Sequence, residues 1–129
     1  MEIKGCILVA EDIEFHPLRR SHSIKSVLNL VEVKLFPAAI VTDVLIKLIL
    51  PKDFNSAEAV VEVHSPDKIV AFRSSFIDVK NFRPDGAVPG MEACLNSRFA
   101  AVEEGSYTYR LLIDEKVFYE YPLYIYSSD

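Results

Sequence analysis

The feature that most constrains the fold is a pair of alternating runs near the end of the sequence, separated by Asp114-Glu115. In Gly105–Ile113 and Lys116–Tyr126, every second residue is apolar or aromatic: Tyr107, Tyr109, Leu111 and Ile113, then Val117, Tyr119, Tyr121, Leu123 and Ile125. A period of two residues is typical of half-buried strands, and two residues between such runs predict a tight turn. Although Asp-Glu is a poorer turn pair than Asp-Gly, we predict a β-hairpin over these residues.

Five earlier stretches are also rich in strand-forming residues and are separated by turn signals. They are Ile3–Ala10, Ser26–Phe36, Ile40–Leu50, Ala57–His64 and Ile69–Val79. Between the last two, Ser65-Pro66-Asp67-Lys68 has proline at the position that a type I turn favours, so we predict a second hairpin there. Short strands punctuated by turns are typical of β-sandwiches and barrels.

Two stretches have a helical alternative, because apolar residues in Ile40–Leu50 and in Met91–Val102 recur at helical as well as strand spacing. The β-branched content favours a strand in the first, and the hairpin that follows favours a strand in the second. Glu11–Ser23 is polar and Asn81–Gly90 carries proline and glycine pairs. We predict a loop or an irregular edge for the first stretch and a loop for the second.

The length of the chain, 129 residues, fits a single domain spanning residues 1–129. Hydrophobic residues make up 50% and charged residues 26% of the sequence, a balance that supports one packed core and argues against disorder. Together with the strand pattern, this predicts an all-β fold, an immunoglobulin-like antiparallel β-sandwich of about seven to eight strands.

One motif carries a resemblance to a known family. Glu103-Glu104-Gly105-Ser106-Tyr107-Thr108-Tyr109 resembles the acidic-x-Gly-x-Tyr-x-Cys stretch of immunoglobulin-like domains. In that family the tyrosine begins a late core strand and its hydroxyl bonds to upstream backbone, which implies that role for Tyr107. Tyr109 stands where antibody domains have a disulfide cysteine, and the sequence has no Trp. The resemblance therefore implies a sandwich of the wider immunoglobulin or fibronectin type and excludes an antibody domain.

The chain also resembles a group of small, uncharacterised bacterial β-sandwich proteins of unknown function. The matching residues are Ala10-Glu11-Asp12, Phe36-Pro37, and Gly105-x-Tyr107 leading to Pro122-Leu123. A glycine-rich start of the second strand, which the group has, is missing from Ser21–Ser26. This resemblance implies the fold and a bacterial cytoplasmic setting, and it brings no activity and no functional residues.

Charge and hydropathy limit the partners and the compartment. Lys and Arg number 14 against 19 Asp and Glu, and the formal charge of −5 repels phosphate backbones. The apolar run Cys6–Ala10 is too short for an export signal or a membrane helix. We expect a cytoplasmic protein that binds neither nucleic acid nor membranes. There, Cys6 and Cys94 should be free and buried, with a disulfide as the alternative.

Motifs for catalysis, metals or cofactors are missing from the sequence. The four glycines are too scattered for a phosphate-binding loop. The cysteines and histidines lack the spacing of a zinc site, and no nucleophile elbow is present. We therefore expect no catalytic residue, no metal and no cofactor, and hence a protein that is not an enzyme.

Two groups of residues remain as candidate binding sites. The first is a polar cluster in the predicted loop 11–23, in which anion-binding guanidinium groups accompany a candidate general base: Glu11, Asp12, His16, Arg19, Arg20 and His22. The alternative for this cluster is a solvated loop with charges of both signs.

The second group is aromatic. All six tyrosines lie between Tyr107 and Tyr126, and alternation places Phe118, Tyr124 and Tyr126 on the face of the final strand opposite its core residues. Such a patch predicts an interface, with face-to-face contact favoured over strand addition because Pro122 removes a backbone donor. Alternatively, the rings pack within the fold or simply suit a strand.

These observations lead to two hypotheses on function. The first is a non-enzymatic binding or structural module that acts on a protein partner or forms a homodimer through the aromatic residues or a strand edge. The second is a small-molecule or carbohydrate-binding sandwich that uses the 11–23 loop. A concave pocket beside that loop would favour the second hypothesis.

Overall fold

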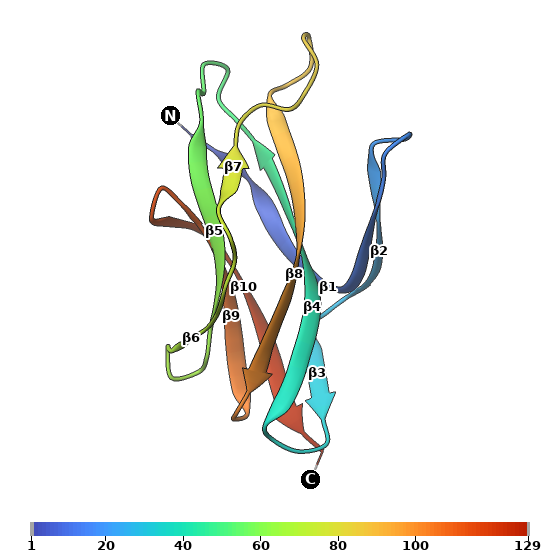
Figure 1. Cartoon of the computed structure of the whole chain (residues 1–129), viewed down its shortest axis with the longest axis vertical. Coiled ribbons are helices and arrows are strands. Elements are labelled where there is room, and N and C mark those ends of the chain that lie inside the picture. Colours follow the sequence, from blue (N-terminus) through green and yellow to red (C-terminus); the bar gives the residue numbers. More distant parts are fainter. Residues whose placement is uncertain (1, 129) are drawn as a thin grey trace.

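The computed structural model describes residues 2–128, which form ten strands and no helix (Figure 1). The strands are β1 (Lys4–His16), β2 (Ser21–Val27), β3 (Leu30–Val33), β4 (Ala38–Ile49), β5 (Ala57–His64), β6 (Val70–Arg73), β7 (Ile77–Val79), β8 (Gly90–Ala101), β9 (Gly105–Ile113) and β10 (Lys116–Ser127). No helix among the described residues could span a membrane.

The strands form two sheets that pack face to face as an immunoglobulin-like sandwich (Figure 1). One sheet has the order β2-β1-β4-β8, and the other has the order β3-β10-β9-β5-β6, with β7 also paired to β5. Among the described strands, β3 and β10 run parallel, and the other pairs are antiparallel. The predicted sandwich is thus confirmed, with ten strands in place of seven or eight.

The core lies between the two sheets and is built by the inward-facing residue of every second position. Its most fully buried members are Val9, Val44, Ile46 and Leu48 from one sheet, and Val61, Val63, Leu111, Leu123 and Ile125 from the other. This alternation confirms the strands expected at 40–50 and 57–64, and β8 confirms that 91–102 is extended. Both ambiguous stretches are long strands because each has one face in the core.

The corner before β9 has the geometry expected of its motif. The hydroxyl of Tyr107 donates to the carbonyl of Glu103 at 2.8 Å, and the Glu103 amide donates back to it at 3.3 Å. Gly105 has φ of 148°, and a Cβ there would lie 2.5 Å from a side-chain carbon of Pro66. Glycine is therefore required at this position both by conformation and by the close approach of the neighbouring turn.

The second motif tyrosine, Tyr109, joins three core strands where antibody domains have a disulfide. Its hydroxyl lies 2.8 Å from Oγ1 of Thr42 on β4, and that oxygen lies 2.9 Å from Oγ of Ser97 on β8. Both hydroxyl side chains are buried, and a buried polar group is stable only when it is hydrogen-bonded. This network links the two sheets without a covalent bond.

The predicted hairpin at Asp114-Glu115 is confirmed. Both residues have positive φ, 47° and 70°, as a two-residue turn that follows the strand twist requires. Asp114 tolerates this because its amide donates to the Glu58 carbonyl at 2.9 Å, and its carboxylate accepts from the Glu58 amide at 3.1 Å. Pairing with β5 therefore stabilises a turn that the sequence alone disfavours.

The outward face predicted for the final strand is wrong at its beginning. The pairing of β10 with β9 shifts register between Val117 and Tyr119. As a result Phe118 packs against the core, and Val117 is 41% exposed. A bulge reverses which residues face inward, so alternation counted from Leu123 fails beyond it. Phe118 therefore does not belong with Tyr124 and Tyr126.

The N-terminal third also differs from the prediction. Residues 11–23 are not a loop: β1 continues to His16, and β2 starts at Ser21 after a four-residue turn. The predicted strand Ser26–Phe36 is divided into the end of β2 and the short β3, and Leu35 is 64% exposed. The β1–β2 hairpin projects away from the sandwich (Figure 1), so water contacts most of both its faces and no clear alternation arises.

The two cysteines are free, as predicted, but exposed rather than buried. Cys6 and Cys94 lie on the outer face of the four-stranded sheet, because the alternate positions Ile7 and Ala93 are the ones that pack toward the core. The prediction of burial came from the residue type alone, and the register of the strands decides otherwise.

Candidate functional site

An open groove of about 930 Å³ lies on the outer face of the four-stranded sheet, beside the projecting β1–β2 hairpin. We call it the hairpin groove. Four segments line it: the hairpin contributes Phe15, Arg20, Ser21, His22 and Ile24; strand β4 contributes Leu45 and Lys47; strand β8 contributes Glu92 and Cys94; and the loop before β8 contributes Phe82, Arg83 and Pro84.

The base of the hairpin is fixed to the sheet by a small second core. Ala10, Ile13 and Leu45 are buried together there, with Leu8 packed against them. The Ile13 amide donates to Oδ2 of Asp43 on β4 at 2.8 Å, just past the last residue of β1 that pairs with β4. The hairpin therefore leaves the sheet at a defined point with its backbone donor satisfied.

The wall formed by the hairpin carries a cross-strand aromatic pair. Phe15 and His22 are register partners, and their ring centroids lie 5.0 Å apart. Ile13 and Ile24 form the next pair toward the sheet. Ile13 is buried, whereas Ile24 stays 38% exposed and faces the groove. The wall is thus mainly apolar near the sheet.

The opposite wall is a loop held in one conformation by backbone bonds. The side-chain oxygen of Asn81 accepts from the amides of Arg83 and Gly90, at 2.9 and 3.0 Å. The Phe82 amide donates to the Gly90 carbonyl at 3.0 Å, and the Lys80 ammonium lies 5.1 Å from the centre of the Phe82 ring. These contacts hold Phe82 and Arg83 in place at the groove.

Cations outnumber carboxylates among the lining residues. Glu92 pairs with Arg83 and lies 3.6 Å from the Lys47 ammonium, so one carboxylate serves two cations. Within residues 2–128, the guanidinium of Arg20 has no hydrogen-bond or ion-pair partner, and it is exposed. The lining itself therefore carries three cations and one carboxylate on a chain of charge −5, and the carboxylates of Asp12 and Asp43 are close enough to act on Cys94.

The lining also contains the thiol of Cys94, and the surroundings of this thiol disfavour its thiolate form. Partial burial raises the pKa of the thiol above its ordinary value, and the charges of Asp43 and Asp12 raise it further. A nucleophilic cysteine needs the opposite, a thiolate stabilised by positive charge. Cys94 therefore lacks the surroundings of a nucleophilic cysteine.

The six predicted polar residues do not form one site. Arg20 and His22 line the hairpin groove. Glu11 instead pairs with Lys25 at 3.1 Å, and Nε2 of His16 lies 2.7 Å from the Ser23 hydroxyl. Asp12 and Arg19 are exposed, and neither lines the groove. The strands place neighbouring residues on opposite faces of the hairpin, which divides the cluster.

The remaining groove residues were not predicted. Phe82, Arg83 and Pro84 lie in a stretch predicted to be a loop, and Leu45, Lys47 and Glu92 lie in stretches predicted to be strands with a helical alternative; no binding role was predicted for any of them. An exposed Phe-Arg-Pro sequence in a loop is a weak signal of a binding surface, since loops often carry function. Only the fold shows that it faces the hairpin.

A second surface lies at the C-terminal end of β10. The rings of Tyr124 and Tyr126 stack with centroids 6.2 Å apart and planes 24° apart. The Tyr124 hydroxyl is 3.4 Å from a carboxylate oxygen of Glu104, and the Tyr126 hydroxyl is 3.2 Å from one of Glu32. The charge of Glu32 raises the pKa of Tyr126. We call these four residues, with the exposed Leu30 that pairs with Tyr124, the tyrosine surface.

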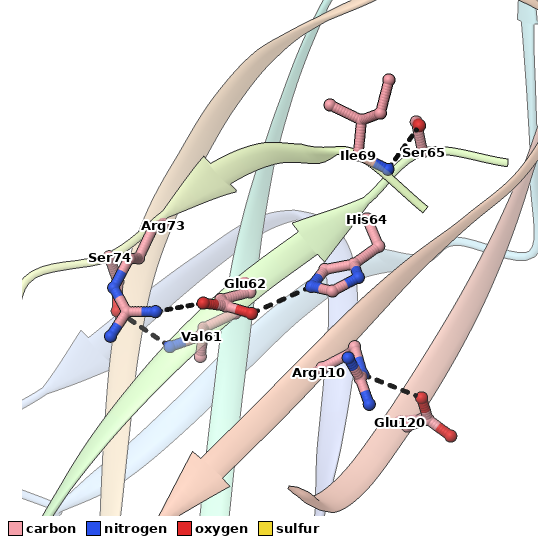
Figure 2. A network of polar contacts seen from close by, with 9 residues as sticks. All are labelled: Val61, Glu62, His64, Ser65, Ile69, Arg73, Ser74, Arg110 and Glu120. Atoms are coloured by element: carbon pink, nitrogen blue, oxygen red, sulfur yellow. Dashed lines mark hydrogen bonds and ion pairs between the residues drawn. The ribbon is translucent and has the colours of Figure 1, made fainter. Parts of the chain in front are cut away.

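A row of charges crosses the outer face of the other sheet (Figure 2). In register across β6, β5, β9 and β10 it consists of Arg73, Glu62, Arg110 and Glu120. Arg73 pairs with Glu62, and Nε of Arg110 donates to Glu120 at 3.1 Å. We call this the charged row; its members alternate in sign.

Glu62 is the most buried member of the charged row, only 8% exposed. Its carboxylate lies 2.9 Å from Nε2 of His64 and also bonds to Arg73. The pKa of Glu62 is lowered mainly by the hydrogen bond with His64; burial opposes this, and the charge of Arg73 adds to it. No group of three or more metal-ligating side chains is present here or elsewhere in residues 2–128.

Comparisons with known proteins find similar solved structures, but no family model and no curated protein matches the chain. Among solved structures, the chain is similar to the CARDB domain of a Pyrococcus furiosus protein, crystallised in complex with di-metal ions. The alignment covers 96% of both chains at 12% identity, with a TM-score of 0.48. A similarity this low carries no argument about metal or function.

Proposed function

We propose that the protein is a non-enzymatic binding module and that the hairpin groove holds its ligand, an anion with an apolar or aromatic body. The observation that carries this proposal is the position of Arg20. Its guanidinium has no partner in residues 2–128, and it lines a groove together with Phe15 and Phe82. Arginine matches the geometry of planar anionic groups such as carboxylates, and the aromatic rings beside it offer apolar contact to the rest of a ligand.

The size and construction of the groove support a ligand site. Its volume of about 930 Å³ is at the upper end of the roughly 300–1,000 Å³ found for small-molecule sites. Both walls are anchored, one by Asp43 and the other by Asn81. A site held in this way loses little conformational entropy on binding.

The charges favour an anion over a neutral sugar. Lys47 and Arg83 share the single carboxylate of Glu92, so each is only partly neutralised. An incoming carboxylate can bond to Arg20 without displacing any existing ion pair. A neutral carbohydrate could stack on Phe15 or Phe82, but it would leave these charges uncompensated.

Three residues of the hairpin resemble the Ser-His-acid triad of hydrolases, but their geometry does not support catalysis. Ser23 Oγ, His16 and Glu14 follow one another across the hairpin, with His16 Nδ1 4.0 Å from Glu14 Oε1. That distance is too long for the hydrogen bond that would orient the imidazole, and the Glu14 side chain is 70% exposed. None of the three residues lines the groove. We therefore assign them to pairing within the hairpin.

The test uses two fluorescent probes with the same aromatic body, anilinonaphthalene sulfonate and the uncharged phenylnaphthylamine. The full-length protein should bind the sulfonate saturably and the neutral probe more weakly. In Arg20→Glu, affinity for the sulfonate should fall by about tenfold or more, which corresponds to about 1.4 kcal/mol. The matched control is Arg98→Glu, which reverses an exposed arginine on β8 outside the groove.

Amide chemical shifts of labelled protein locate the probe. The expected shifts fall on the hairpin, the 81–90 loop and the facing residues of β4 and β8. Equal binding of the two probes, equal affinity in Arg20→Glu and wild type, or shifts confined to the opposite sheet would each contradict the proposal.

A further inference from the structure

The tip of the β1–β2 hairpin exposes a leucine side chain next to two arginines. Leu18 is fully exposed, at 101%, in the turn between Pro17 and Arg19-Arg20. Single exposed leucines are common on protein surfaces. This one is flanked by two guanidinium groups that have no acidic partner among residues 2–128. The tip therefore offers a hydrophobic contact and two positive charges together.

The tyrosine surface offers the complementary chemistry. Two stacked rings and the 60% exposed Leu30 form its apolar centre, and the carboxylates of Glu32 and Glu104 flank the rings. Guanidinium groups are attracted to aromatic faces and to carboxylates alike. A cationic hairpin tip with a leucine at its end fits this surface in both charge and polarity.

The same carboxylates argue against the face-to-face contact that the aromatic residues alone suggested. A two-fold contact between two tyrosine surfaces would bring Glu32 and Glu104 of one copy against the same residues of the other. Like charges placed together in an interface cost several kcal/mol. The occupant of the tyrosine surface should instead be cationic, and the chain itself carries such a segment.

We propose that the hairpin tip of one copy docks on the tyrosine surface of a second copy, so that the protein associates head to tail. The tip and the C-terminal end of β10 lie toward opposite ends of the molecule (Figure 1). Two different patches meet in such a contact, and it therefore builds chains or rings rather than an isolated two-fold dimer. This inference does not depend on a ligand in the hairpin groove.

Sedimentation velocity of the full-length protein from micromolar to millimolar concentration tests the proposal. The wild type should show a mean mass that rises with concentration. The tip variant Arg19→Glu, Arg20→Glu and the surface variant Glu32→Lys, Glu104→Lys should each stay monomeric. A control with the same charge change as the tip variant, Lys52→Glu, Arg98→Glu, lies outside both patches and should associate like the wild type.

Mixing the variants distinguishes this contact from any other. The surface variant keeps an arginine tip and the tip variant keeps an acidic tyrosine surface, so an equimolar mixture should form a complex that neither forms alone. The quadruple variant, with both patches reversed, should associate with itself again. A wild type that stays monomeric at every concentration, a tip variant that associates normally, or a mixture that gives no complex would each overturn the proposal.

Discussion

The two outer faces of the sandwich use charged residues in opposite ways. On the five-strand path β3-β10-β9-β5-β6, the charged row sets each cation beside an acid on the neighbouring strand, and Glu62 is bonded to Arg73 on β6 and to His64 on its own strand. On the four-stranded sheet, the hairpin groove leaves Arg20 unpaired among residues 2–128 and makes Lys47 and Arg83 share Glu92. The charged row is satisfied by its own members and His64, whereas the hairpin groove has capacity for another molecule.

This difference shows how to separate structural from functional polar residues in one small domain. Opposite charges in register across strands stabilise the sheet that carries them. In the hairpin groove, Lys47 and Glu92 are register partners on β4 and β8, but Arg20 and Arg83 lie outside the paired strands and contribute little to strand pairing. Substitutions in the charged row should therefore affect stability, and substitutions in the hairpin groove should affect ligand binding, except at the residues that anchor the groove.

A substitution in the small core that anchors the groove should have the largest effect on stability. Ile13→Ala removes most of a buried side chain from the small core beneath the hairpin, and we expect the free energy of unfolding to fall by about 2–3 kcal/mol. Urea denaturation measures this change. Ile24→Ala, on the adjacent strand but 38% exposed, is the matched control and should cost less than about 1 kcal/mol. Equal losses would mean that the second core does not hold the hairpin.

Substitution at the buried end of the charged row should give the next largest loss of stability. Glu62→Gln keeps the shape of the side chain but weakens its bonds to His64 and Arg73, and we expect a loss of about 1–2 kcal/mol. Glu120→Gln alters the exposed end of the row, where the glutamate side chain is 53% exposed, and should change stability by less than about 0.5 kcal/mol. Probe binding in the groove should be unchanged in both variants.

The sequence predicts a strand of this fold well where one face of the strand lies in the core, and poorly where both faces are exposed. The hairpin around Asp114-Glu115 and the corner at Tyr107 were predicted because alternation and the Gly-x-Tyr motif are local signals. Residues 11–23 were mistaken for a loop because that hairpin is largely exposed on both faces. Phe118 was placed on the wrong face because a bulge changes the parity of a strand without changing its composition.

Only some of the residues of the hairpin groove could be identified from the sequence, because the groove joins segments that are far apart in it. Arg20 and His22 were identified because charged residues cluster there in the sequence. Phe82 and Glu92 were missed because their roles come from the placement of a loop and an edge strand beside the hairpin. That arrangement joins segments about 60 to 70 positions apart, and no spacing rule within a single sequence reports it.

A pH titration sharpens the assignment of Glu62. Its pKa in the folded protein is below the ordinary value of 4.5, so the folded state favours the charged form. This contribution to stability is present above pH 4.5 and is lost as the pH falls through the folded pKa. The stability difference between wild type and Glu62→Gln should therefore shrink below pH 4.5, as followed by urea denaturation at several pH values. A difference that stays constant or grows in acid would assign the effect of the substitution to packing.

The smallest expected effect on stability is at Arg20, and it tests the comparison most directly. Arg20 is exposed in the turn of the hairpin with φ of 52°, and no ion pair holds it. Arg20→Gly should leave the free energy of unfolding within about 0.5 kcal/mol of the wild type, because glycine adopts positive φ without strain. The same variant should lose affinity for anilinonaphthalene sulfonate, which fluorescence titration measures beside the melting curve. If Arg20→Gly instead destabilised the fold as Glu62→Gln is expected to, the guanidinium would have a structural role, and the contrast between the two faces would fail. A stable variant with weakened binding would show that the hairpin holds a charge that folding does not need.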